Sequence, residues 1–414
     1  MSSTPIPLPR LGVDLLSDET QMPAGAVRAA VNVDIDKRGQ FKRRQGYAPT
    51  GLAGEFAGSL YAWAGRLIAY RNRELISIDP DTMAFEVLGD LDGYAPTDFT
   101  PYNGRLYVCT QRALWVLRGG AAVLAGSRLP DALPSIQAHD AGALPAGQYM
   151  AAISMLDESG EESPAVVLGQ IDTQAGLLLT GLPVVPGKRW RLYLTPPNGD
   201  VLYLAEEFDA VFGQYVVAGY PSSAVCQTLN MAPMPGGDFV RARGGRLYVA
   251  SKDALWFSEP LRPHMTAPRH NFVRFIGDMR FVEWVGGGVF VGDSRGVWWL
   301  SGEDPTQFAQ RQVSDAVPVA RSSVLVPMHR LGVMQSRSTT DCAVWLSADG
   351  YMVGAPDGQV TALHPDRIRL NPDNNLSGQS ALLLRDGLQQ IITLTASVGP
   401  AHVFGAAIDT APIQ

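Results

Sequence analysis

The sequence has few cysteines and histidines, and this scarcity argues against disulfide frameworks and metal centres. The 414 residues include only Cys109, Cys226 and Cys342, each more than a hundred residues from the next. An odd number at such distances provides neither a disulfide scaffold nor a Cys-x-x-Cys zinc motif. The six histidines form no His-x-x-x-His pair and none lies beside a cysteine. We therefore predict no metal site, and expect the cysteines to be small buried apolar residues.

Long apolar runs and an excess of positive charge are also missing. No stretch reaches the roughly 18 uninterrupted apolar residues of a membrane-spanning helix, and the N-terminus lacks the features of a signal peptide. We therefore expect a protein that is made in, and soluble in, a reducing cytoplasm and does not enter membranes. With 33 basic and 40 acidic residues, the net charge is −7. Such a balance lacks the basic footprint that a protein needs to wrap nucleic acid.

Glycine, proline and apolar residues are abundant, and a repeat organises them. Apolar residues make up 46% of the chain, and 43 glycines and 30 prolines suit many tight turns. Four twelve-residue segments align without gaps, and each consists of a glycine, an apolar run, a short polar group and a second apolar run. They are residues 65–76, 104–115, 245–256 and 287–298. This pattern is typical of a β-hairpin.

The first run of each repeat predicts a strand that is covered on both faces. In the second copy Leu106 and Val108 point one way while Tyr107 and Cys109 point the other, and all four are apolar or weakly polar. A half-exposed strand would alternate with charge instead. Both faces of this strand are therefore expected to pack against neighbouring sheets.

The repeat spacing predicts an all-β propeller. The intervals from Gly65 to Gly104 and from Gly245 to Gly287 are 39 and 42 residues, and a four-stranded blade takes about 40–45. A weaker fifth copy starts at His329 and reaches residues 344–346, and a sixth candidate starts at Gly387. We therefore predict about six blades. An irregular antiparallel β protein with recurring hairpins remains the alternative.

One interval breaks the period and predicts an inserted domain. Gly104 and Gly245 are 141 residues apart, so about a hundred residues are left after one period, which is the size of a β-sandwich. Strands are expected from Pro145 and at residues 176–180, 189–194 and 201–205, with residues 157–164 forming an acidic, well-solvated turn. The predicted division is residues 1–129 and 233–414 for the propeller and 130–232 for the sandwich. The insertion resembles the fibronectin type III-like modules of phage tail proteins.

The segments that match catalytic or ligand-binding motifs are better explained as turns. Residues 292–296 read Gly-Asp-Ser-Arg-Gly and fit the nucleophile elbow G-x-S-x-G, but no helix pattern follows, so we predict a hairpin turn. Residues 34–39 match half a calcium loop without its third acidic ligand or its distal glutamate. No phosphate-binding loop occurs. We predict no catalytic residues, no cofactor and no enzyme activity.

One basic cluster is the candidate contact site for an acidic partner or for passing DNA. The alternative is an exposed hairpin around Gly39, with Asp34 and Asp36 partly neutralising the charge. The cluster consists of Lys37, Arg38, Lys42, Arg43 and Arg44.

The segment that contains this cluster resembles a known family. Residues 29–47 follow the pattern N-x-D…G…R-R-x-G-Y, which is similar to the opening of tail nozzle or hub proteins of short-tailed bacteriophages. The resemblance implies a non-enzymatic virion protein that forms a homohexameric ring below the portal and adaptor. Tail spikes or fibres would be further partners, and DNA would pass without specific binding. A glycan-binding or glycan-cleaving propeller, or a bacterial propeller scaffold, are the alternatives.

Overall fold

The structure is all-β. The computed structural model describes residues 11–31, 33–35, 40–43, 50–217, 219, 222–331, 340–363, 376–385, 388–397 and 406–409. Besides strands, these residues include two single 3-10 turns, at Pro305–Gln307 and Met328–Arg330. No helix in this described part is long and apolar enough to cross a membrane.

Six antiparallel sheets follow one another along the chain, and in each the strands are paired in chain order. Sheets 1 to 5 have four strands and sheet 6 has three. Sheet 1 is β5 (Phe56–Trp63), β6 (Arg66–Arg71), β7 (Glu74–Ile78) and β8 (Phe85–Asp90); sheet 2 is β9 (Pro96–Tyr102), β10 (Arg105–Thr110), β11 (Leu114–Arg118) and β12 (Ala121–Leu124); sheet 3 is β21 (Phe239–Arg243), β22 (Arg246–Ser251), β23 (Ala254–Phe257) and β25 (Phe272–Arg274); sheet 4 is β26 (Met279–Val285), β27 (Gly288–Asp293), β28 (Gly296–Ser301) and β29 (Ala309–Ser314); sheet 5 is β30 (Val324–Pro327), β31 (Asp341–Ser347), β32 (Gly350–Gly354) and β33 (Val360–Ala362); sheet 6 is β34 (Leu376–Arg385), β35 (Leu388–Ser397) and β36 (Ala406–Asp409).

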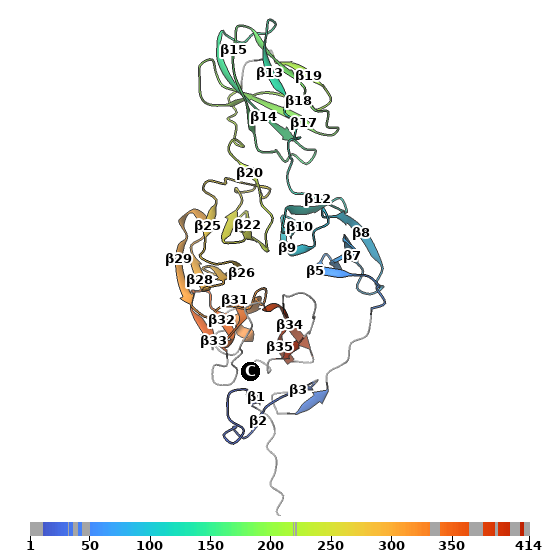
Figure 1. The fold of residues 1–414 in the computed structure, drawn as a ribbon, viewed down its shortest axis with the longest axis vertical. Helices are drawn as coiled ribbons and strands as arrows, with labels where there is room; N and C mark the ends of the chain where they lie inside the picture. The colour runs from blue at the N-terminus through green and yellow to red at the C-terminus, as the bar shows by residue number, and fades with distance from the viewer. Residues whose placement is uncertain are drawn as a thin grey trace, which may run out of the picture.

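The six sheets are arranged around a common centre, as in a β-propeller (Figure 1). Their first strands lie innermost and contact each other in turn, from β5 to β9, β9 to β21, and β21 to β26. Farther along, β26 contacts β31 and β30 contacts β34. The expected β-propeller-like, all-β architecture is therefore present. The six sheets of one chain are together called the ring below.

Residues that alternate along β10 enter two different cores, as the sequence predicted. Leu106 and Val108 pack with apolar residues of sheet 1. Tyr107 and Cys109 pack on the opposite face with residues of sheet 3, among them Val249. All four are buried. Each strand of this kind joins two neighbouring sheets, which explains why its sequence is apolar on both faces.

The repeat glycines occupy tight turns between the first and second strands of a sheet. Gly65, Gly104 and Gly245 have φ of 76°, 71° and 76°, and each follows another residue with positive φ. Two consecutive positive φ values define the type I′ hairpin turn, in which glycine is favoured. The glycines are therefore required by the backbone of these turns.

The fifth repeat copy was placed wrongly. His329 lies in the 3-10 turn Met328–Arg330, and residues 332–339 are outside the described part. Residues 344–346 belong to β31, the second strand of sheet 5, whereas the alignment had assigned them to the third. The longer connection after β30 displaces the hairpin, so a fixed period does not find it. The sixth copy fits better, because β35 begins at Leu388.

Residues 135–217, called the inserted body below, form two further sheets that share one core around the fully buried Trp190. Figure 1 shows the inserted body at one end of the molecule, beyond sheets 2 and 3. The strands predicted at residues 176–180 and 189–194 are confirmed, and that predicted from residue 201 begins at residue 203. One sheet is β13 (Ser135–His139), β16 (Gly176–Thr180) and β19 (Gln214–Val217); the other is β15 (Val166–Thr173), β14 (Gly147–Leu156), β17 (Arg189–Leu194) and β18 (Tyr203–Asp209).

Three small sheets complete the described structure. Near the N-terminus, β1 (Gly12–Val13) pairs with β2 (Ala26–Val27) in parallel, and β3 (Val33–Ile35) forms a hairpin with β4 (Phe41–Arg43). The chain returns from the inserted body through β20 (Ala232–Pro233), which pairs with β24 (Met265–Thr266).

Candidate functional site

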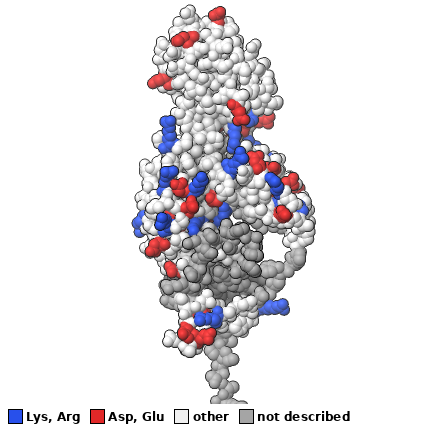
Figure 2. Space-filling model, in the orientation of Figure 1, with Lys and Arg blue, Asp and Glu red and all other residues white. Residues whose placement is uncertain are grey.

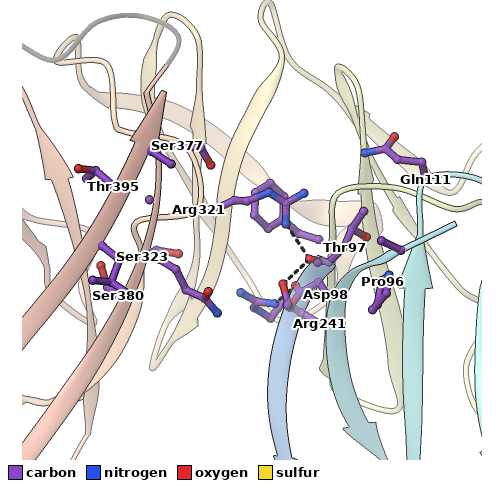
Figure 3. Close-up of a pocket in the computed structure, with 18 of the residues that line it drawn as sticks. Pro96, Thr97, Asp98, Gln111, Arg241, Arg321, Ser323, Ser377, Ser380 and Thr395 are labelled. Atoms are coloured by element: carbon purple, nitrogen blue, oxygen red, sulfur yellow. Dashed lines mark hydrogen bonds and ion pairs between the residues drawn. The ribbon is translucent and has the colours of Figure 1, made fainter. Parts of the chain in front are cut away.

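A cavity of about 770 Å³ lies where the first strands of several sheets begin. Figure 3 shows sheet 6 on one side of this cavity and the starts of β9 and β21 on the other, with Arg321 between them. The lining is rich in hydroxyl groups and contains two arginines and one carboxylate. The polar lining residues include Ser59, Thr97, Asp98, Gln111, Arg241, Arg321, Ser323, Ser377, Ser380 and Thr395.

Arg241 on β21 joins three sheets in the wall of this cavity. Its guanidinium forms an ion pair with Asp98 of β9 and a second one, at 2.9 Å, with Glu283 of β26. Asp98 also accepts a hydrogen bond from the backbone N–H of Val240 at 3.0 Å, and Glu283 accepts one from the Ser323 hydroxyl at 2.8 Å. The planar fork of arginine suits such a two-sided arrangement.

These contacts fix the charge state of Arg241. Burial alone would lower its pKa, but the negative charges of Asp98 and Glu283 and the hydrogen bonds that Arg241 donates to both outweigh burial, so the pKa lies above its ordinary value. Glu283 is only 4% exposed. The carboxylates of Asp98 and Glu283 are thus engaged in ion pairs with Arg241 that link three sheets.

Arg321 crosses the cavity from the opposite side. It lies between β29 and β30 with a φ of 61°, which is uncommon for a residue other than glycine. Its guanidinium donates to the backbone oxygen of Thr97 at 2.6 Å and to Asp238 at 3.1 Å, and lies 5.1 Å from the centre of the Phe239 ring. Its neighbour Ala320 pairs with Ser377 of sheet 6. This segment thus connects sheet 6 to sheets 2 and 3 across the centre.

The hydroxyl groups of the lining mostly bond within the protein. Ser59 donates to the backbone oxygen of Thr97 at 3.0 Å, Thr97 donates to that of Gly237 at 2.7 Å, and Ser380 donates to that of Ser322 at 2.5 Å. Hydroxyl oxygens keep acceptor capacity for a polar ligand. The cavity can therefore receive a neutral polar molecule, and among its described lining residues no nucleophile lies beside a base.

A second polar cluster joins the inserted body to sheet 2. In the turn at residues 157–164, predicted to be acidic and well solvated, residues 158–160 are exposed, but Asp157 and Glu161 face sheet 2 and the Glu161 side chain is only 14% exposed. Glu161 pairs with Arg118 at 2.8 Å and with Arg105 at 3.2 Å, and accepts the backbone N–H of Gly126 at 3.1 Å. Asp157 also pairs with Arg118, at 3.3 Å. The prediction was wrong for Asp157 and Glu161, because sequence spacing does not show the arginines that approach from sheet 2.

The next residue, Glu162, binds within the inserted body. It accepts hydrogen bonds from the hydroxyls of Ser154 at 2.6 Å, Tyr193 at 2.5 Å and Thr228 at 3.1 Å, and pairs with Arg191 at 2.8 Å. Tyr193 has a raised pKa, because of burial first and the hydrogen bond to Glu162 second. Thr228 belongs to the segment that leads back to the ring, so Glu162 fixes that segment to the inserted body.

His264, which directly precedes β24 in the connection between β23 and β25, contacts the same junction. It is 7% exposed, its Nε2 atom lies 3.1 Å from the backbone oxygen of Glu162, and its Nδ1 atom has no hydrogen-bond partner among the described residues. Burial lowers the pKa of His264, and the negative charge of Glu161 opposes that change. We call Glu161, Glu162, Arg118 and His264 the neck cluster.

The predicted basic cluster is only partly described. Lys42 and Arg43 lie on β4 with exposed side chains, and residue 42 pairs with residue 34 in the hairpin register. Lys37, Arg38 and Arg44 are outside the described residues. The expected hairpin is confirmed, and contact with DNA or a partner stays a prediction.

The G-x-S-x-G motif is a hairpin turn, as predicted. Asp293 and Gly296 are paired at the ends of β27 and β28. Asp293 is fully buried and accepts hydrogen bonds from Trp298 Nε1 at 2.9 Å and from the backbone N–H of Arg295 at 2.7 Å. The motif therefore stabilises its own turn. Among the described residues, no group of three or more His, Cys, Asp or Glu side chains could hold a metal ion.

Arg241, Arg321 and the neck cluster could not be recognised from sequence patterns. Arg241 lies in a five-residue strand, Phe239–Arg243, that has too few residues for a clear period. The available signal was a charged residue within a short β-branched and apolar run just before a repeat glycine. Its partners are over 40 and over 140 residues away, and spacing alone does not identify them.

No family model matches the chain, and no curated protein matches it. Solved structures that it is similar to include BBS1N in complex with ARL6DN (12% identity, 87% of this chain and 95% of the other, TM-score 0.34). Others are the Pan2 WD40 domain of Neurospora crassa (9%, 82% and 86%, TM-score 0.33) and a putative 6-phosphogluconolactonase from Bacteroides fragilis (11%, 86% and 95%, TM-score 0.30).

Proposed function

We propose that this chain is a structural, non-enzymatic component of a bacteriophage tail, in which several copies form a nozzle or hub around the DNA-exit channel. In this proposal the six sheets are the blades of a propeller, and the inserted body is a fibronectin-like β-sandwich spliced between the second and third blades. The N-terminal resemblance of residues 29–47 suggests the family, and the arrangement of charges inside the ring supports an architectural role.

The observation that carries the proposal is that the charged groups around the central cavity bind each other and the backbone, and so link different sheets. Arg241 holds β9, β21 and β26 together through Asp98 and Glu283, and Arg321 connects sheet 6 with sheets 2 and 3. An enzyme needs such groups for its substrate, whereas a structural wall needs them for stiffness. Contacts between residues that are far apart in sequence stabilise the ring against deformation.

The neck cluster supports the same role. Two bodies joined only by peptide linkers are expected to move relative to each other. Glu161 and His264 instead make direct contacts across the junction. A fixed orientation allows the inserted body to bind neighbouring tail components at a defined position.

The proposal is tested by assembly. Purified protein is examined by mass photometry and negative-stain microscopy, and six copies of the 44.5-kDa chain are expected in a closed ring, alone or with a portal–adaptor complex. Genes for portal and terminase proteins beside the coding sequence would support the assignment. A protein that stays monomeric with the adaptor present, encoded away from any phage gene, would contradict it.

A second candidate function is glycan binding in the axial cavity. Its size and its hydroxyl-rich lining suit a polar, uncharged sugar. Asp98 and Glu283 are both ion-paired with Arg241, and this pairing gives no support to glycan cleavage, which uses one carboxylate as an acid and a second as a base or nucleophile. Binding to a glycan array that Gln111→Ala or Thr395→Ala weakens would favour this function over the tail role.

A further inference from the structure

The inserted region accounts for the entire negative net charge of the protein, because the rest of the chain has a net charge of +1. Residues 130–232 contain 11 acidic and 3 basic residues, a net charge of −8, whereas the whole chain has −7. In Figure 2 acidic and basic groups are mixed over the ring, while the upper part of the inserted body displays acidic but no basic groups. Two inserted bodies that approach each other with such a charge repel each other.

This charge is absent from one side of the inserted body. Three segments, residues 132–138, 174–187 and 210–219, contain no Asp, Glu, Lys or Arg. They comprise most of β13 and all of β16 and β19, which form one complete sheet, together with the loops at one of its ends. Charged residues lie instead on the opposite sheet, including Arg189, Glu206 and Asp209.

The outward side of this sheet is an ordered, uncharged surface. Leu177, Leu179 and Val217 face the core. The residues between them form two rows across the three strands: Ser135 opposite Thr180 opposite Gln214, and Gln137 opposite Leu178 opposite Val216. Val216 is 41% exposed, although it is a large apolar residue.

The apolar surface continues into a hollow at one end of the sheet. The hollow is lined by residues 180–181 and 211–214 and has a volume of about 600 Å³. Val184, Val211 and Phe212 beside it are 58%, 52% and 50% exposed. Backbone hydrogen bonds connect the two loops that carry these side chains, from Leu182 to Gly213 and from Val185 to Ala210. The hollow is therefore part of the fixed structure.

We propose that this surface, the charge-free face, is the contact between the inserted bodies of two copies of this chain. It consists of Ser135, Gln137, Leu178, Thr180, Val184, Val211, Phe212, Gln214 and Val216. A basic partner of another kind would bind the acidic surface of the inserted body. A second copy carries the same net charge, so it can approach without charge repulsion through a face that has no charges.

The size of the face sets the expected affinity. Three strands spaced about 4.8 Å apart, with 4 or 5 residues each, cover an area of roughly 14 by 15 Å, to which the loops add. This is smaller than the roughly 800 Å² per partner of a stable interface. The contact is therefore weak between free chains, and it contributes most where other surfaces already hold the copies close together.

The experiment is sedimentation velocity of the full chain from about 1 to 200 µM, with charge introduced into the face by Val216→Arg or Gln137→Lys. The matched control is Val167→Arg on β15, because Val167 is 44% exposed but lies on the opposite sheet. We expect concentration-dependent association of the wild type and of the control, and a loss of at least tenfold in affinity for both face variants. Near-ultraviolet circular dichroism checks that each variant is folded.

Two results would overturn the proposal: a wild type that is monomeric throughout this range, or face variants that associate as well as the control. If other surfaces already form a stable ring, a bismaleimide linker tests the face directly. Val216→Cys is expected to cross-link between copies and Val167→Cys to remain unlinked, and the reverse would reject the contact. This inference requires that copies of the chain pair, but it does not require a phage tail. A closed ring of copies in which Val216→Cys stays unlinked would therefore refute the contact and leave the proposed tail function standing.

Discussion

Glu161 and Glu162 are consecutive in the chain, but their carboxylates bind opposite sides of the junction between the inserted body and the ring. Glu161 pairs with Arg105 and Arg118 of sheet 2, and Glu162 pairs with Arg191 of the inserted body. Neighbouring residues of an extended segment point in opposite directions, so two adjacent side chains suffice to fix both bodies. The orientation of the inserted body relative to the ring therefore depends on a few residues.

Replacing Glu161 with Gln is expected to loosen the junction. Arg118, whose side chain is 28% exposed, would lose its closest ionic partner, and hydrogen bonds to charged groups contribute about 1.5–3 kcal/mol each. Hydrogen exchange should speed up at Gly126 and residues 157–164, while the core of sheet 4 stays unchanged. Glu158→Gln, at an exposed position of the same loop, is the control and should leave both regions as they are.

Replacing Arg241 with Met is expected to destabilise the ring by about 3 kcal/mol. The change leaves Asp98 and Glu283 without their common cation, and breaking a buried pair on one side costs about 3–5 kcal/mol, somewhat less here because the Arg241 side chain is 23% exposed. Urea unfolding followed by tryptophan fluorescence measures the loss. Arg243→Met on the same strand is exposed and should change the unfolding free energy by under about 0.5 kcal/mol. Equal effects of the two would refute the structural role of Arg241.

Stability is expected to fall as the pH decreases below about 6.5 because of His264. Burial lowers the pKa of His264 in the folded state, so the unfolded chain binds a proton at a higher pH, near 6.5. The unfolded state then holds more protons than the folded state, and stability decreases as the pH falls below this value. The pKa of Asp157 is lowered because hydrogen bonds from Ser159 and the charge of Arg118 outweigh burial. Its contribution therefore persists until below about pH 3.8.

Urea midpoints at pH 7.5, 6.0 and 5.0 separate the two groups. His264→Gln keeps a donor for the backbone oxygen of Glu162 and should remove the loss between pH 6.5 and 5. His270→Gln is the control. A wild-type midpoint that is constant over this range would contradict the assignment to His264.

The losses of unfolding free energy caused by two core substitutions should add only when the two residues lie in different cores. Leu106 and Leu75 share one core, whereas Leu247 lies in the next. Each is fully buried, so each Leu→Ala change should cost about 2–5 kcal/mol. Leu106→Ala with Leu247→Ala should add within about 0.5 kcal/mol, and Leu106→Ala with Leu75→Ala should deviate by more, because one cavity changes the surroundings of the other. The same deviation in both pairs would show that the two cores relax as one.

The sequence was sufficient for the features that local chemistry dictates. Positive φ at Gly65, Gly104 and Gly245 and the apolar alternation of β10 belong to each hairpin itself, so the repeat and the β-propeller-like fold could be predicted. The same reasoning failed at residues 329–346, where a longer connection replaces the tight turn. Whether the inserted region ends at residues 130 and 232 remains a prediction.

The candidate site could not be predicted, because its contacts join distant parts of the chain. Arg321 meets Thr97 across 224 residues, and Glu161 meets Arg105 across 56. A charged residue in a sequence is usually exposed, so the acidic loop at residues 157–164 looked solvated until its arginine partners were in place. Only the fold brings these groups together.

The position of the insertion has a consequence for synthesis on the ribosome. The face of β10 that carries Cys109 is covered by sheet 3, and its contact with Gly237 spans 128 residues. At about 5–20 residues per second, that side of the nascent sheet stays bare for roughly 6–26 s while the intervening region is translated. A nascent chain that lacks sheet 3 therefore exposes apolar surface for many seconds. In this period chaperones can bind it and neighbouring nascent chains can aggregate.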